Sequence, residues 1–183
     1  MCFLKLAKKC TLHPSNLKNV FMNPFLLHAL SALVPLIIGF IWYNPKVFGT
    51  AWLKSINMTE EQMKGANMAV IFGVTYVFSF MLSFFLTSVV VHQMGVFSLI
   101  ADMPADVQDM GKALVAKAGL GYNTFKHGAL HGTIASVFFA LPILGINALF
   151  ERRGAKYIFI HLGYWFITLG IMGALICHFT IVS

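Results

Sequence analysis

Residues Met68–His92 read MAVIFGVTYVFSFMLSFFLTSVVVH and contain no Asp, Glu, Lys or Arg. A helix needs about 20 consecutive, mainly apolar residues to cross roughly 30 Å of hydrocarbon. In lipid such a segment must bond its backbone polar groups internally, which a helix does. The stretch therefore predicts a membrane-spanning helix.

The composition of the whole chain agrees with this prediction. Of its 183 residues, 58% are hydrophobic and only 10% are charged, whereas soluble domains carry about a quarter charged residues. This composition excludes a water-soluble globule, and it excludes disorder, which needs low hydrophobicity and high charge. We assign the net charge of +7 to flanking residues that orient helices and meet lipid headgroups, and not to nucleic-acid binding.

Three further uncharged runs predict three further spans. We place the four spans at Phe25–Tyr43, Met68–His92, Gly128–Phe150 and Tyr157–Thr180. A barrel is a poor alternative, because it needs at least about eight strands that alternate apolar and polar residues. The predicted fold class is an all-α membrane protein, a four-transmembrane-helix antiparallel bundle. The short link between the last two spans makes them a hairpin, and four spans place both termini on the same side.

The long link between the second and third spans predicts an amphipathic surface helix. Val107, Met110, Leu114 and Ala118 fall at helical spacing, with charged residues between them. Such a helix lies on the membrane surface or against the bundle, or it is an ordinary solvated connector.

The first 22 residues differ in composition from the rest, and Met22-Asn23-Pro24 has the form of a natural start. We therefore interpret residues 1–22 as an N-terminal extension and residues 23–183 as a single membrane domain. The hypothesis is that the mature protein begins at Met22, and the alternative is a start at Met1. Without the extension, Lys and Arg number 3 on one side and 6 on the other. The positive-inside rule then places both termini of this multi-pass cell-membrane protein on the non-cytoplasmic side.

Several short motifs point to one family. They are Ala32-Leu33-Val34-Pro35, Gly39-Phe40-Ile41-Trp42-Tyr43-Asn44-Pro45, Phe48-Gly49 with Trp52, Met58-Thr59-Glu60-Glu61, His127-Gly128, His131-Gly132, Asn147 with Leu149-Phe150-Glu151-Arg152-Arg153, Gly163-Tyr164-Trp165 and Met172-Gly173-Ala174. From about Asn23 to its end, the chain resembles the small bacterial membrane proteins grouped as domain of unknown function 1761. The resemblance implies a four-helix integral protein of a bacterial inner membrane, of uncharacterised activity, and it supplies no catalytic residue.

Small and aromatic residues predict how the helices pack and where they meet the interface. Close backbone approach through small residues is a main source of helix association in lipid. The candidate packing positions are Gly128, Gly132, Ser136, Gly163 and Gly170. Aromatic residues gather at membrane interfaces, and the candidate anchors are Trp42, Tyr43 and Trp52.

Five histidines lie near span ends that share one side in an up-down bundle. They are His28, His92, His127, His131 and His178. His127 and His131 are four residues apart and project from one helical face, which provides half of a metal site. The five form a candidate cluster for a metal, a haem or a proton. The alternative is that each bonds loops or lipid headgroups at its helix end.

Two classes of function stay open. The sequence has no phosphate-binding glycine loop, nucleophile elbow or paired carboxylates, so we do not expect an enzyme. The first hypothesis is a non-enzymatic accessory subunit or small-solute permeability component without a cofactor. It has the lipid bilayer as its surroundings and other membrane proteins or further copies of the chain as candidate partners. The alternative is a metal- or haem-binding bundle that uses the histidines, since bundle cores often house such groups.

Overall fold

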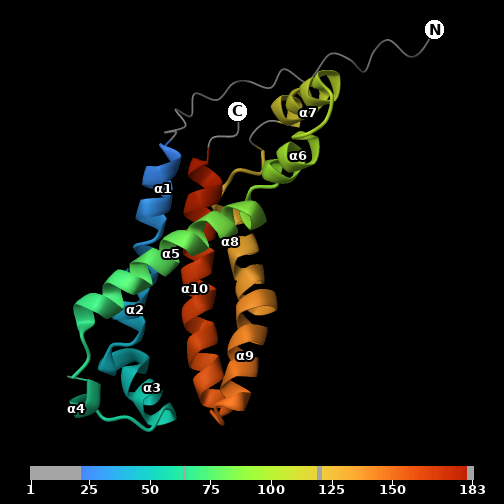
Figure 1. Cartoon of the computed structure of the whole chain (residues 1–183). Coiled ribbons are helices and arrows are strands. Elements are labelled where there is room, and N and C mark those ends of the chain that lie inside the picture. Colours follow the sequence, from blue (N-terminus) through green and yellow to red (C-terminus); the bar gives the residue numbers. More distant parts are fainter. Residues whose placement is uncertain (1–21, 64, 119–120, 181–183) are drawn as a thin grey trace, which may run out of the picture.

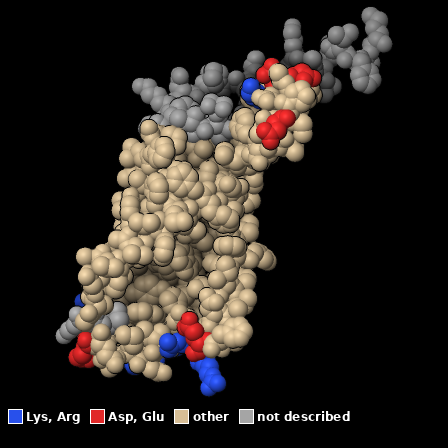
Figure 2. All heavy atoms as spheres, in the orientation of Figure 1, with Lys and Arg blue, Asp and Glu red and all other residues tan. Residues whose placement is uncertain are grey.

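The computed structural model describes residues 22–63, 65–118 and 121–180, in which the regular structure is helical (Figure 1). Its four long apolar helices are Pro24–Trp42, Met68–Val90, Phe125–Phe150 and Ala155–Phe179. They confirm the predicted all-α fold class and indicate a membrane-embedded protein. On the face drawn in Figure 2, the charged side chains gather at the two ends and leave the middle uncharged. The predicted N-terminal extension lies, up to residue 21, outside the described residues.

The first span consists of two helices, α1 (Pro24–Ser31) and α2 (Val34–Trp42). Asn23 caps α1, its side chain accepting from the backbone N–H groups of the first turn. The break falls at Ala32 and Leu33, just before Pro35, which has no N–H to donate to the carbonyl of Ser31.

A compact turn follows the first span. It comprises a π-helical turn, η1 (Pro45–Gly49), and two short helices, α3 (Thr50–Ser55) and α4 (Glu60–Met63). Thr59 and Gln62 form a capping box at α4: the Thr59 N–H donates to Gln62 Oε1 at 2.9 Å, and the Gln62 N–H donates to Thr59 Oγ1 at 3.4 Å. This box begins a separate short helix, because the second span has its own cap at Asn67.

The second span, α5 (Met68–Val90), lies obliquely across the bundle and leads into two helices beyond its end (Figure 1). These are α6 (Gln93–Ile100) and α7 (Ala105–Ala118), of which only α7 was expected from the sequence. The buried positions of α7 are Gly111 and Val115, and a Cβ at Gly111 would meet the Ile100 side chain. Of the predicted apolar positions, Met110 is 71% exposed and Leu114 is 60% exposed, so α7 packs on α6 through a different face.

The third span is built from α8 (Phe125–Ala135), the π-helical turn η2 (Ser136–Ala140) and α9 (Leu141–Phe150). The π-turn ends two residues before Pro142, whose missing N–H leaves the carbonyl of Phe138 without its α-helical donor. A tight turn then leads into α10 (Ala155–Phe179) and closes the predicted hairpin. Arg152 takes the left-handed conformation there, with φ of 55°.

Helix α10 lies at the centre and contacts α1, α2, α5, α8 and α9. Its closest neighbour is α8, where a Cβ at Gly128 or Gly132 would meet the backbone carbonyl of Gly173 or Leu169. The other predicted packing positions also lie in contacts: Gly163 against Trp42, Gly170 against Thr133, and Ser136 fully buried. Leu86, Val90, Met172 and Ile176 fill the core beside this contact.

Candidate metal centre

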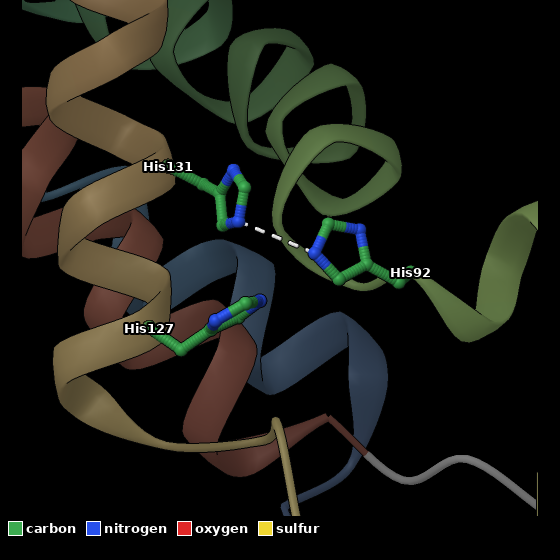
Figure 3. A group of neighbouring side chains, drawn as sticks. All are labelled: His92, His127 and His131. Atoms are coloured by element: carbon green, nitrogen blue, oxygen red, sulfur yellow. Dashed lines mark hydrogen bonds between the residues drawn. The ribbon is translucent and has the colours of Figure 1, made fainter.

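Three of the seven histidines converge where the second and third spans meet. His92 lies at the bend between α5 and α6, and His127 and His131 lie one turn apart on α8 (Figure 3). Each ring offers a nitrogen, and the three nitrogens lie within 4.8 Å of one another. His92 is exposed, whereas His127 and His131 are partly buried, so the group is open on one side.

The spacing of the nitrogens suits a tetrahedral ion. His92 Nε2 and His131 Nε2 are 3.2 Å apart. Two imidazole nitrogens bound to Zn²⁺ at about 2.0–2.1 Å and at a tetrahedral angle are about 3.3 Å apart. His127 Nε2 is buried and has no hydrogen-bond partner among the described residues. A buried polar atom without a partner is costly, and an ion bound by this nitrogen would remove that cost.

Local structure positions each ring. Val91 is extended and breaks the helix, so the chain turns at His92. On the facing side, Thr124 caps α8, and its Oγ1 accepts from the His127 N–H at 3.2 Å. The four-residue spacing of His127 and His131 then places both rings on one face of the first turns of α8.

A buried amide pair that the sequence analysis did not single out joins the two sides. Gln93 Nε2 donates to Asn123 Oδ1 at 2.8 Å, and both side chains are buried. Gln93 follows His92 directly, and Asn123 precedes the Thr124 cap. The pair thus connects the backbone on either side of the cluster. The sequence signal for this pair was an amide side chain close to each histidine motif, Gln93 after His92 and Asn123 before His127.

The other two histidines of the predicted cluster lie elsewhere. His28 Nδ1 bonds Ser83 Oγ at 3.0 Å, and its ring stacks on Phe84. His178 stacks on Phe125 with the ring centroids 3.9 Å apart. The structure therefore brings together three of the five predicted residues. Histidines at the same level of the bundle point to different neighbours, because each helix has its own rotation about its axis.

The predicted interfacial anchors gather at the opposite end of the bundle. Trp42 Nε1 donates to the carbonyl oxygen of Ile160 at 3.0 Å, and Tyr43 lies against Trp52. Tyr43 Oη bonds His161 Nδ1 at 2.8 Å. Burial raises the pKa of the Tyr43 phenol above its ordinary value, and the nearby Tyr164 and Tyr157 raise it further. These contacts tie the end of α2 to the start of α10.

Comparison with known protein families gives a match over most of the chain. The family described as "Protein of unknown function (DUF1761)" matches residues 26–177. No curated protein and no solved structure matches the chain.

Proposed function

We propose, from the premise that the chain belongs to the DUF1761 family of proteins of unknown function, that it is a membrane protein that binds one transition-metal ion. The ligands are His92, His127 and His131. The observation that carries the proposal is the convergence of three imidazole nitrogens, within 4.8 Å of one another, from two separate spans. Imidazole suits Zn²⁺, Cu²⁺, Ni²⁺ and Fe²⁺, and three such ligands leave a fourth position to water or another molecule.

The geometry favours an ion over a haem. Two axial histidines of a haem lie on opposite faces of the macrocycle, with their nitrogens about 4 Å apart when each bond is about 2 Å. His92 Nε2 and His131 Nε2 are 3.2 Å apart, and this leaves no space for a macrocycle between them. His127 also lies on the same helical face as His131, not across from it.

The proposal is for ion binding by a non-enzymatic protein. The three histidines form a ligand group without an Asp or Glu side chain among the described residues. At many metal sites a carboxylate accepts from the second ring nitrogen of a ligand histidine and strengthens binding. Among the described residues, no carboxylate does so for His92, His127 or His131. We therefore expect micromolar affinity. Of the two classes of function left open by the sequence, the cluster favours metal binding, and an accessory or permeability role is compatible with it.

The test is a titration of the full chain, purified in mild detergent without a polyhistidine tag and freed of metal. Co²⁺ is the probe, because its visible absorption bands report tetrahedral coordination. We expect one Co²⁺ per chain, displaced by Zn²⁺. Saturating ion raises the stability of the folded state, by about 2.7 kcal/mol at 100 times the dissociation constant.

Three variants make the test specific. His131→Ala and His92→Ala each remove one ligand, and we expect either to abolish the tetrahedral spectrum. His92 is exposed, so its replacement disturbs packing least. His178→Ala is the matched control, a histidine that stacks on Phe125 outside the cluster, and it should bind as wild type does. Absence of saturable Co²⁺ binding, or equal binding by His131→Ala, would refute the proposal.

A further inference from the structure

A pocket of about 440 Å³ lies at one end of the bundle, separate from the three-histidine cluster. Its walls come from the start of α1, the last turns of α5, the start of α6 and the residue after α10. The volume is within the range of about 300–1,000 Å³ that is usual for small-molecule sites. Because its walls include the ends of three spans, the pocket lies at the level where lipid headgroups meet the hydrocarbon.

One buried imidazole of the pocket has a free acceptor. Ser83 Oγ is 2.6 Å from the carbonyl oxygen of Phe80, and since a carbonyl cannot donate, the hydroxyl proton of Ser83 lies in that bond. Ser83 Oγ must then accept from His28 Nδ1, 3.0 Å away. The neutral ring of His28 thus carries its proton on Nδ1 and presents the bare lone pair of Nε2. His28 is only 7% exposed and lines the pocket, and Nε2 has no partner among the described residues.

Two hydroxyl groups in the walls are acceptors as well. Thr87 Oγ1 donates to the carbonyl oxygen of Ser83 at 3.0 Å, and Thr180 Oγ1 donates to that of Ile176 at 2.6 Å. Each uses its single proton in the helix backbone and keeps only lone pairs for a ligand. The polar part of the wall therefore has three acceptors whose own protons are used elsewhere or absent, and beside them the Ser88 hydroxyl, which can donate or accept.

We propose that this pocket binds a lipid-soluble molecule whose polar end carries hydroxyl donors. Leu27, Phe84 and Met94 supply apolar wall for its body, and His28 Nε2 accepts from its hydroxyl group. None of the described residues that line the pocket is acidic, so a neutral hydroxyl fits better than an ammonium group. An ester or quinone carbonyl has no proton to donate and is excluded from this position. Two sources share the chemistry, a glycerol headgroup and a lipid-soluble hydroquinone.

The experiment uses the full chain in an amine-oxide detergent, which has no hydroxyl group to compete. The probes are monooleoylglycerol and decylhydroquinone, each paired with its O-methylated derivative. We expect at least one hydroxyl probe to bind and its methylated partner to bind about tenfold more weakly, the factor that corresponds to 1.4 kcal/mol. Whichever probe binds identifies the source. Binding of neither probe, or equal binding of the methylated partner, overturns the proposal.

Substitutions of His28 separate its two nitrogens. His28→Asn places an amide N–H near the position of Nδ1 and keeps the bond to Ser83, but it removes the Nε2 acceptor. His28→Gln places an amide oxygen near the position of Nε2. We expect His28→Asn to weaken binding about tenfold and His28→Gln to restore part of it. His178→Asn, outside the pocket, should bind as wild type does.

A pocket-filling variant provides a test that leaves His28 intact. Ser88 lines the pocket, and Ser88→Met adds apolar volume there while keeping the His28–Ser83 bond. It should weaken the hydroxyl probe while Co²⁺ still binds at the separate cluster. Binding by His28→Asn or Ser88→Met with wild-type affinity would contradict the proposed site.

Discussion

The contact between α8 and α10 predicts opposite outcomes for the same substitution at two glycines of one span. At Gly132 an added Cβ would meet the backbone carbonyl of Leu169 on α10. At Gly145 in α9 an added Cβ has no described atom within 4 Å. Gly132→Ala and Gly145→Ala are therefore a matched pair that differ in the space around one methyl group.

The expected magnitudes follow from two effects. In a helix Ala is favoured over Gly by about 0.8–1.0 kcal/mol, so Gly145→Ala should stabilise by up to that amount. At Gly132 the neighbour is backbone and cannot rotate away, so the two helices must separate. Overpacking of this kind costs typically about 1–3 kcal/mol. Because both glycines are helical, the propensity gain is common to the two variants and cancels, so their free energies of unfolding should differ by about 1–3 kcal/mol.

Thermal unfolding of the purified protein in detergent measures this difference. For a chain of this length about 1 kcal/mol corresponds to roughly 2–4 °C, so the melting temperature of Gly132→Ala should lie about 2–12 °C below that of Gly145→Ala. Because His131 is the neighbour of Gly132, Gly132→Ala should also weaken Co²⁺ binding. Equal melting temperatures for the two variants would refute the close approach of α8 and α10.

Further predictions concern the amide pair, the opposite end and the membrane. Gln93→Leu removes the bond that joins the backbone on either side of the cluster, and it should weaken Co²⁺ binding by up to about tenfold, the factor that corresponds to the roughly 0.5–1.5 kcal/mol of one hydrogen bond. Gln108→Leu, on α7, is the control. Tyr43→Phe leaves His161 Nδ1 without its partner and should lower the unfolding free energy by about 1–3 kcal/mol. Folding raises the pKa of Tyr43, so the stability that depends on its neutral phenol is present below about pH 10 and is lost as the pH rises through the folded-state pKa. Denaturant titrations should therefore show that the unfolding free energy of Tyr43→Phe falls less above about pH 10 than that of the wild type. Washing membranes with alkaline carbonate should leave the chain in the pellet, and its release would contradict the membrane-embedded fold.

Local patterns were sufficient for the spans and several of their ends. The uncharged run after Asn67 predicts a helix because only backbone bonds within the segment satisfy its polar groups in lipid. The structure ends that helix at Val90, two residues before the predicted end. Pro35 acts within a few residues of its own position, so the break in the first span can also be predicted from sequence. The Thr59 capping box marks a helix start, but that helix is the separate α4 and not the second span.

The candidate metal centre could be predicted only in part. The pair His127 and His131 follows from helical spacing alone. Its third member depends on how α5 crosses α8 and on the turn at Val91, which brings in His92 and not His28 or His178. The same limit applies to α7, where Gly111 admits the Ile100 side chain and turns the expected apolar residues outward.

The sequence by itself determined that four apolar segments are long enough to cross a membrane and that histidines lie near their ends. Hydropathy and helical periodicity are properties of consecutive residues. The tertiary structure decided that His92, His127 and His131 meet and that Nε2 of His28 has no partner among the described residues. Both depend on the rotation and crossing of helices, which contacts between residues far apart in the chain decide: those of α8 with α10 at Gly132, and the bond between His28 on α1 and Ser83 on α5.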